Sequence, residues 1–475
     1  MRMKLRRSSQ RPQDLSDPLA EPHSPSRRDD PGVPNDRSSS LAPEQQGAAN
    51  LKPASDGFLR SGFALALAAA GSLLAATLIT ACSQLTQTLT VDFVYVACSK
   101  AAGANNYGEI DVFEINSESG RMRQIPTSPF PSGGRNPVAE AVSADYQNLF
   151  VVNQYDNTLV QFAIGIDGKL YPFNTVNTPG IYPMAVAANK SNVFVVDTYE
   201  PIPLCSTAEP CSGSISVFPL VTGGSSSSAP CAASVCLQPA VVNTGINASY
   251  WPLTLSGANS SHVIVPTAVN VLPSGAYVYV TAYDSSVLPT VGYIFGFAVG
   301  SGGALTPLSG SPYPAGAQPS AIASDPTSTY VYVTDLPSAN ILGYNAAAGS
   351  LTPLSGSPFP TGAQPAGIVV DPSYPYAYVT NSLDGTVTAY SSSNGNLSSI
   401  GTYATGLDPT AIGVDPSTNR FLYTVNFLDN TISGFELSIS AGTLLNSQYS
   451  PFNTSAQPTA VAAIPHNGTG GGVQQ

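Results

Sequence analysis

A proline-headed apolar segment recurs seven times along this chain, and this repeat constrains the fold more than any other feature. Each proline is followed three residues later by a large residue, which is aliphatic in six of the seven copies. The first six copies then run through a turn into an aromatic-rich strand, as residues 319–325 do into strand 330–334. A period of about 45 residues that holds four short strands is typical of a β-propeller blade. The seven prolines are Pro137, Pro183, Pro266, Pro319, Pro365, Pro409 and Pro458.

The two ends of the repeat predict how the ring closes. The first aromatic-rich strand, 93–97, has no proline-headed strand before it, and the last proline-headed strand, 458–463, has no partner after it. Pairing these two strands leaves no exposed sheet edge, which would otherwise invite aggregation. The sequence therefore predicts an all-β fold, a seven-bladed β-propeller of four-stranded antiparallel blades over residues 93–466. Residues 467–475 are predicted to be a flexible tail.

The N-terminal part predicts export. Residues 61–81 carry no charge, follow Arg60 and have the composition of a secretory hydrophobic region. They end in Leu78-Ile-Thr-Ala81 before Cys82, which resembles a bacterial lipobox and implies a lipid-modified cysteine, with residues 82–92 as linker. An uncleaved membrane anchor is the alternative, because about 20 apolar residues can span a bilayer. Both interpretations place the propeller outside the cytoplasm, in the cell envelope of a bacterium.

Residues 1–60 precede this hydrophobic region. They are rich in Arg, Asp, Ser and Pro and contain hardly any apolar run before residue 58, so they are predicted to be disordered. Either they are a cytoplasmic tail, or the chain starts further downstream than its first methionine.

Four cysteines lie in a long segment of the third blade, residues 201–262, where the spacing between repeat prolines is stretched. In an oxidising compartment, Cys205, Cys211, Cys231 and Cys236 are expected to form two disulfides. A zinc site is the alternative, but it usually needs tighter cysteine pairs or nearby histidines. We expect residues 201–262 to form a disulfide-pinned loop that contacts a protein or glycan partner. Cys98, which ends an apolar strand, is expected to be a buried free thiol.

Charge limits the classes of partner. After Cys82 the chain has seven Lys and Arg against 21 Asp and Glu, a net charge near −14. Without a basic face, a role in nucleic-acid binding is excluded. The chain shows no phosphate-binding loop and no cluster of metal ligands, so it predicts no cofactor and no metal. We expect a monomer that meets the membrane through its lipid anchor.

Several short sequence motifs of the repeat resemble those of a known family. Tyr378-Val-Thr-Asn381 resembles the motif of the YVTN group of seven-bladed propellers. Residues 331–344 are similar in sequence to one blade of the bacterial lactonase family, the 6-phosphogluconolactonase-like propellers. The resemblance extends over residues 93–466 and implies that fold together with lactone hydrolysis. Family lactonases also carry histidine and arginine beside several prolines and a glutamate after a strand-end asparagine. This chain has Ser320, Ala366, Thr410 and Gln154 at the matching places.

Glu140 and Arg135 are the candidate catalytic residues. Glu140 stands three residues after Pro137, where the other six copies have Val or Ile. A carboxylate in a row of buried aliphatic residues is costly unless it is paired, and Arg135 is close in sequence. One hypothesis is a polar pair at the channel mouth that binds a ligand. The other is a purely structural pair, or a register shift that leaves Glu140 in solvent.

The other polar residues have mainly structural explanations. Asp325, Asp371 and Asp415 each precede a proline and are expected to open turns, with a calcium-binding ring as the alternative. His262 and His466 are expected to be loop residues. The single Trp251 is expected to pack within its loop, although an exposed indole could stack on carbohydrate.

These observations predict a lipid-anchored propeller of the cell envelope that acts as a binding or scaffold module, without catalysis. The alternative is a divergent lactonase-like hydrolase that opens a sugar lactone or another lactone with Glu140 and Arg135. The two hypotheses differ in one geometric requirement. Hydrolysis needs Arg135, Glu140 and a histidine to converge at one mouth of the channel, because water activation and oxyanion stabilisation require groups within hydrogen-bonding reach.

Overall fold

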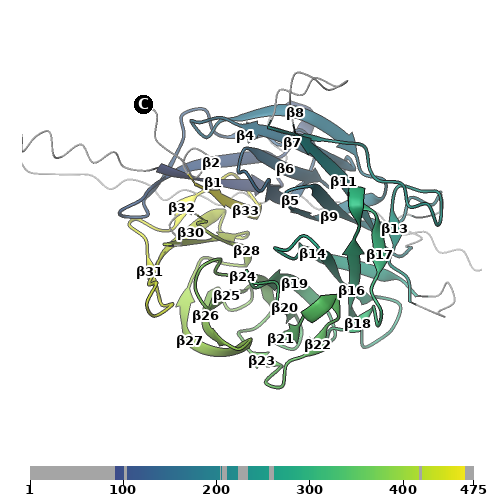
Figure 1. Ribbon diagram of the computed structural model, residues 1–475. Coiled ribbons are helices and arrows are strands. Elements are labelled where there is room, and N and C mark those ends of the chain that lie inside the picture. Colours follow the sequence, from purple (N-terminus) through teal and green to yellow (C-terminus); the bar gives the residue numbers. More distant parts are fainter. Residues whose placement is uncertain are drawn as a thin grey trace, which may run out of the picture. The chain divides into compact units, whose positions relative to one another are not determined.

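The computed structural model describes residues 91–465, except 101–103, 204, 206–210, 223–233, 256–261 and 417–419. Within them, seven antiparallel sheets stand around a common axis (Figure 1). The predicted hydrophobic region, Cys82 and the chain's first 60 residues lie outside the described residues, as do Cys231 and His466. In the part that is described, no helix is long and apolar enough to cross a bilayer.

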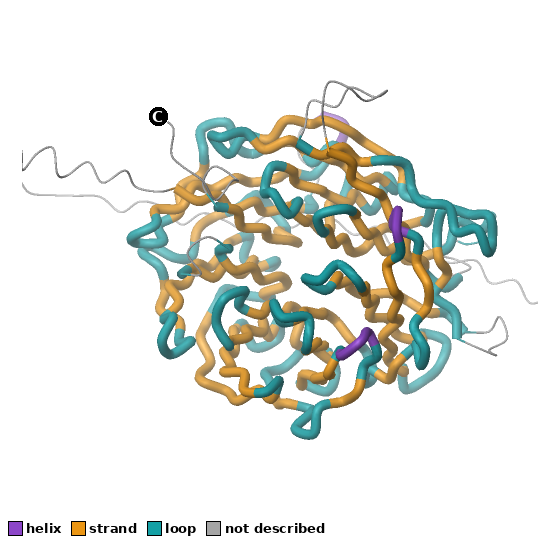
Figure 2. The backbone as a smooth tube through the Cα atoms, in the orientation of Figure 1, coloured by secondary structure: helices purple, strands orange, loops and turns teal. Residues whose placement is uncertain are grey.

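Each sheet is one blade, with strands A to D ordered from the axis outward (Figure 2). Strands A, in blade order, are β33 (Pro458–Ile464), β5 (Pro137–Val142), β9 (Ile181–Ala188), β14 (Ile264–Val271), β19 (Pro319–Ser324), β24 (Pro365–Val370) and β28 (Pro409–Val414). Strands B are β1 (Val91–Cys98), β6 (Asn148–Asn153), β10 (Asn192–Tyr199), β15 (Tyr277–Asp284), β20 (Tyr330–Asp335), β25 (Tyr376–Asn381) and β29 (Phe421–Asn426).

The outer strands follow the same blade order. Strands C are β2 (Glu109–Asn116), β7 (Thr158–Ile164), β11 (Ser214–Thr222), β16 (Val291–Val299), β21 (Asn340–Asn345), β26 (Thr386–Ser393) and β30 (Thr431–Leu437). Strands D are β3 (Met122–Gln124), β8 (Leu170–Asn177), β12 (Val235–Leu237), β17 (Leu305–Pro307), β22 (Thr352–Pro353), β27 (Asn396–Ala404) and β31 (Leu444–Asn446). Short strands that also pair with strands C are β4 (Phe130–Pro131), β13 (Trp251–Pro252), β18 (Tyr313–Pro314), β23 (Phe359–Pro360) and β32 (Phe452–Asn453). The 3-10 helices are η1 (Ala104–Asn106), η2 (Ser301–Gly303) and η3 (Ala347–Gly349).

The C-terminal strand closes the ring, as predicted. β33 pairs antiparallel with β1, with Phe93 opposite Ile464 and Val96 opposite Val461. β33 also lies between β28 and β5, so the seven strands A form a complete inner ring (Figure 1). This confirms both the count of seven blades and the pairing of the two ends of the repeat.

The hydrophobic core lies between neighbouring blades, because strand B alternates its side chains between two neighbours. In β6, Leu149 and Val151 pack toward blade 1, whereas Phe150 and Val152 pack toward blade 3. Tyrosines of strand B add hydrogen bonds to this packing. Their hydroxyls donate to glycine carbonyls in the C–D turn of the next blade: Tyr95 to Gly168 (3.0 Å), Tyr279 to Gly349 (2.8 Å), Tyr332 to Gly395 (2.9 Å) and Tyr378 to Gly442 (3.2 Å).

Residues 201–262 do not form a single loop, and this corrects the sequence-based expectation. They contain β11 and β12, the third and fourth strands of blade 3, together with β13. Strand C of this blade contains serines, in Ser214-Ile-Ser-Val-Phe218, and its composition therefore resembles that of the Ser-rich segments around it. Cys205 and Cys211 form a disulfide, which confirms the first of the two predicted bonds. Cys236 is disulfide-bonded too.

Two further expectations about packing are confirmed. Trp251 is only 6% exposed and belongs to the core between blades 3 and 4, so it packs inside the protein and does not offer a stacking surface. Cys98 is a free thiol and is completely buried.

Candidate functional site

The ends of strands B, the B–C turns and the loops that enter strands A lie at one end of the ring. We call this end the B–C face, because it carries the turns from strands B to strands C and the loops that enter strands A. The opposite A–B face carries the A–B and C–D turns. Of the seven Lys and Arg in the described residues, only Lys100 and Arg135 lie on the B–C face.

The last residue of strand B, opposite the repeat proline, holds the loop that enters strand A. The Asp335 carboxylate accepts hydrogen bonds from the backbone amides of Ala317 (3.2 Å) and Gln318 (2.8 Å). Asn381, the asparagine of the YVTN phrase, accepts one from Gly362 (3.0 Å) and donates to Thr388 (2.9 Å). These side chains are buried, and their bonds stabilise the blade. The signature asparagine is therefore a structural residue here.

Arg135 pairs with Asp156 and not with Glu140. Its side chain, which is half exposed, lies 2.5 Å from the Asp156 carboxylate in the B–C turn of blade 2, and its backbone amide also donates to that group (2.7 Å). Asp384 and Asp429 accept the equivalent loop amides in blades 6 and 7. Asp156 thus performs the same turn-holding role as these two, and Arg135 adds an ion pair to it.

Glu140 lies between blades 1 and 2, and its environment differs from both expectations for it. Its two carboxylate oxygens are buried and have no hydrogen-bond partner among the described residues. Burial raises the pKa of this carboxyl to about 8, an effect that the nearby backbone amide of Ala462 only moderates. In the other six blades this position holds an aliphatic residue of the core between blades: Val186, Val269, Ile322, Ile368, Ile412 and Val461.

His262 lies in a third location, at the entry to blade 4. Its Nδ1 lies 2.5 Å from Oδ2 of Asp284, whose carboxylate is buried and also accepts the backbone amide of Ser286 (2.9 Å). The imidazole is one-third exposed. Arg135, Glu140 and His262 therefore occupy three separate environments and share no hydrogen bond.

Asp325 and Asp371 act as turn openers, as predicted. Asp325 accepts hydrogen bonds from the backbone amides of Thr329 (2.7 Å) and Tyr330 (2.6 Å), and Asp371 accepts them from Ser373 (2.8 Å) and Tyr374 (2.9 Å). Such bonds hold the turns. In Asp371 both bonds go to Oδ1, and the buried Oδ2 has no hydrogen-bond partner among the described residues.

Three tyrosines on the B–C face form a feature that the sequence reasoning missed. Tyr155 belongs to the B–C turn of blade 2, and Tyr182 and Tyr199 belong to blade 3. The ring centroids of Tyr155 and Tyr182 are 6.1 Å apart and those of Tyr182 and Tyr199 are 6.0 Å apart, both edge-to-face. We call these three residues the tyrosine row.

One signal in the sequence could have revealed the row. The residue just before the repeat proline is polar in five blades and Val265 in blade 4, and only blade 3 places an aromatic residue there, Tyr182. The polar residues are Asn136, Gln318, Gln364, Asp408 and Gln457.

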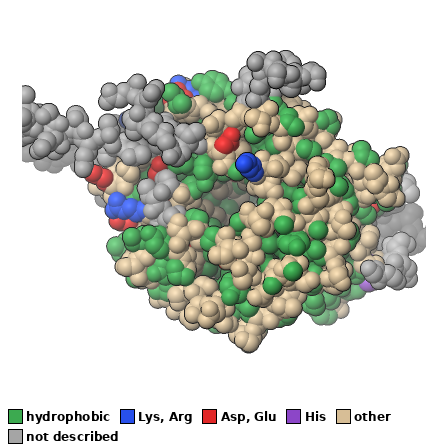
Figure 3. All heavy atoms as spheres, in the orientation of Figure 1, with side chains coloured by type: hydrophobic (Ala, Val, Ile, Leu, Met, Phe, Trp, Pro, Cys, Tyr) green, Lys and Arg blue, Asp and Glu red, His purple; other side chains and the backbone are tan. Residues whose placement is uncertain are grey.

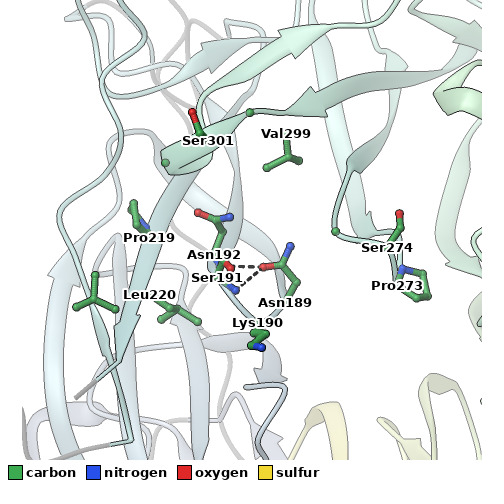
Figure 4. Close-up of a pocket in the computed structure, with 14 residues that line it drawn as sticks. Asn189, Lys190, Ser191, Asn192, Pro219, Leu220, Pro273, Ser274, Val299 and Ser301 are labelled. Carbon is green, nitrogen blue, oxygen red and sulfur yellow. Dashed lines mark hydrogen bonds between the residues drawn. The ribbon is translucent and has the colours of Figure 1, made fainter. Parts of the chain in front are cut away.

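A cavity of about 610 Å³ opens on the A–B face between blades 3 and 4 (Figure 4). The turns 189–192, 219–221, 273–275 and 299–302 line it. Oδ1 of Asn189 accepts the backbone amides of Ser191 (2.9 Å) and Asn192 (2.8 Å), which fixes one wall (Figure 4). Lys190 is the one charged residue among those that line the cavity. The cavity offers shape and amide groups but no acid–base pair.

The matched family agrees with this architecture. Residues 238–462 match the family model of the lactonase seven-bladed β-propeller, a segment that begins in blade 3 and continues into β33. No curated protein sequence matches the chain.

Solved structures share the lactonase-type fold at low identity. A "putative 6-phosphogluconolactonase" of Bacteroides fragilis superposes with a TM-score of 0.60 at 20% identity, covering 80% of this chain and 99% of that one. The periplasmic gluconolactonase of Pseudomonas aeruginosa gives a TM-score of 0.60 at 16% identity, covering 79% and 99%. A similar protein of Bacteroides uniformis gives 0.59 at 18%, covering 79% and 100%. At these identities the likeness concerns the fold of the lactonase-type propeller and not its chemistry.

Proposed function

We propose that this lactonase-type propeller acts as a ligand-binding module of the cell envelope and does not hydrolyse lactones. The observation that carries the proposal is the separation of Arg135, Glu140 and His262. Arg135 and His262 each have their own partner, Asp156 for Arg135 and Asp284 for His262. A side chain that is already paired in this way must leave its partner before it can act on a substrate.

The inner strands support the same conclusion. Apart from Glu140, they consist mainly of Pro, Ala, Ser, Thr, Gly and aliphatic residues, as in β19 and β28. Lactone opening requires a group that activates water and donors aimed at the developing oxyanion. Charged side chains are sparse on the face seen in Figure 3, where hydrophobic and uncharged side chains predominate.

Lactone hydrolysis is the second candidate function, and two observations favour it. The family match covers residues 238–462. In addition, the pKa of about 8 keeps the Glu140 carboxyl protonated at neutral pH, as a general acid requires. Against it, both oxygens of Glu140 are closed off from solvent, so a substrate cannot reach them without local opening between blades 1 and 2.

A lactone-hydrolysis screen of the purified protein beside Glu140→Gln distinguishes the two candidates. The panel contains glucono-δ-lactone, 6-phosphogluconolactone and an aliphatic γ-lactone, each corrected for spontaneous opening. We expect neither protein to raise the rate above background. Turnover by the parent protein that drops by about 100-fold or more in Glu140→Gln, the size of effect of a lost acid–base group, would establish the hydrolase instead.

The proposal also places the propeller on the outer side of a membrane, held by a diacylglyceryl group on Cys82. The uncharged residues 61–81 and the lipobox-like 78–82 support this location. Mass spectrometry of the mature N-terminus is expected to find lipid-modified Cys82 and no residue before it. An intact peptide that runs from Arg60 through Gln84 would show instead that the hydrophobic region is retained as an anchor.

A further inference from the structure

We infer that the tyrosine row of Tyr155, Tyr182 and Tyr199 is a binding site for an uncharged oligosaccharide. This inference rests on the proposed binding function and names its ligand class. A pyranose ring has an apolar C–H face and a polar rim, and a tyrosine has an apolar body and a polar tip. Aromatic surfaces spaced about one sugar ring apart therefore suit consecutive residues of a glycan.

The hydroxyls of the row are available for a ligand. Tyr279 and Tyr378, within strands B of blades 4 and 6, are completely buried and donate to glycine carbonyls. By contrast, the described structure gives the hydroxyls of the row no hydrogen bond, and the Tyr155 side chain is 57% exposed. Buried tyrosine hydroxyls usually find a partner inside the protein. Tyr182 and Tyr199 are half-buried, and the hydroxyls of the row keep their bonding capacity for a ligand.

Tyr182 is held in a costly backbone conformation. Its φ angle is +58°, a left-handed value that bulky residues rarely adopt. Two hydrogen bonds hold it there: its amide donates to Oδ1 of Asn157 (2.8 Å), and its carbonyl accepts from Oγ1 of Thr198 (2.7 Å). The residue before the repeat proline has a similar left-handed φ in four other blades, at Asn136, Gln364, Asp408 and Gln457, so this conformation belongs to the repeat. In blade 3 it holds a tyrosine ring in place. A ring fixed before binding loses little entropy when a ligand arrives.

The charges around the row favour an uncharged ligand. Arg135, which is next to Tyr155 and donates to its carbonyl (3.3 Å), is already neutralised by Asp156. The other cation of the B–C face, Lys100, belongs to blade 1. An anionic polymer would therefore find no free cation at the row. The Asp156 carboxylate is likewise engaged. Glu200, which follows Tyr199, is half-buried, and burial raises its pKa to about 6. The cationic hexamer in the titration below therefore tests whether this carboxylate attracts a positive ligand.

Calorimetric titration tests the site with hexamers of cellulose, maltose and chitin, beside the cationic hexamer of deacetylated chitin and the anionic polygalacturonate. We expect at least one neutral hexamer to bind, with an affinity that is unchanged by added salt. Tyr155→Ala and Tyr182→Ala should each weaken it roughly tenfold. Tyr171→Ala is the matched control, because Tyr171 is 53% exposed on β8, in strand D at the outer edge of blade 2, and should leave binding unchanged.

Three outcomes overturn the inference. They are the absence of binding by every neutral hexamer, binding that survives in both row variants, and salt-dependent preference for the charged polymers. Circular dichroism of each variant verifies that the fold is intact. The lactone screen is independent of this test, so failure of glycan binding without hydrolysis refutes the ligand class alone, whereas lactone turnover refutes the proposed function.

Discussion

A chain truncated after Gln457 is expected to lose its cooperative thermal transition. The deletion removes β33, which pairs with β1 and packs between β28 and β5. It also removes the buried Ile464 and the Thr459 hydroxyl, which donates to the carbonyls of Ala97 (3.1 Å) and Pro137 (2.9 Å). The open ring would expose unpaired edges in β1 and uncovered apolar faces of blades 2 and 7.

The expected loss exceeds about 5 kcal/mol, which is comparable to the whole stability of many domains. Calorimetry and circular dichroism measure it. The matched control is a chain that ends at Pro465, which keeps all of β33 and should melt like the full protein. If the chain truncated after Gln457 also melts like the full protein, β33 does not close the ring in solution.

Replacing Glu140 with valine is expected to stabilise the protein, and to do so most above pH 8. The folded-state pKa of about 8 lies above the usual value of 4.5, so between these two pH values the folded protein holds one more proton than the unfolded chain. Stability therefore falls as pH rises through this window and reaches its full loss above the folded pKa. A shift of this size corresponds to about 5 kcal/mol. Glu140→Val removes that loss and restores the aliphatic residue of the other six blades.

Urea unfolding at pH 5 and at pH 8.5 measures the effect. Glu140→Gln is the control, because it abolishes the titration but leaves a buried polar group, so it should flatten the pH dependence without the full gain in stability. Part of the dependence will remain in both variants, since burial also raises the pKa of Asp197 to about 7. If Glu140→Val loses as much stability between these pH values as the parent protein does, Glu140 ionises freely in the folded state.

The repeat made the architecture predictable from the sequence. The register between strands A and B is set by three local features: the proline, the aliphatic residue three positions later and the aromatic pairs. Because the repeat occurs seven times, a deviation in one copy does not obscure the pattern. The same locality explains the correct interpretation of Asp325 and Asp371, because an Asp-Pro turn is decided within a few residues. Blade 3 was harder, since strand C at Ser214–Thr222 has a composition that resembles its neighbouring loops.

The candidate site was decided by the tertiary structure. Arg135 was close to Glu140 in sequence, but the B–C turn brings Asp156, 21 residues away in sequence, within 2.5 Å of it. The tyrosine row likewise joins residues from two blades. The number of blades, strands A and B and the closure of the ring could be predicted from the sequence, because they depend on local, repeated patterns. Which side chains meet could not, because each contact depends on how two separate turns or two neighbouring blades are placed in space.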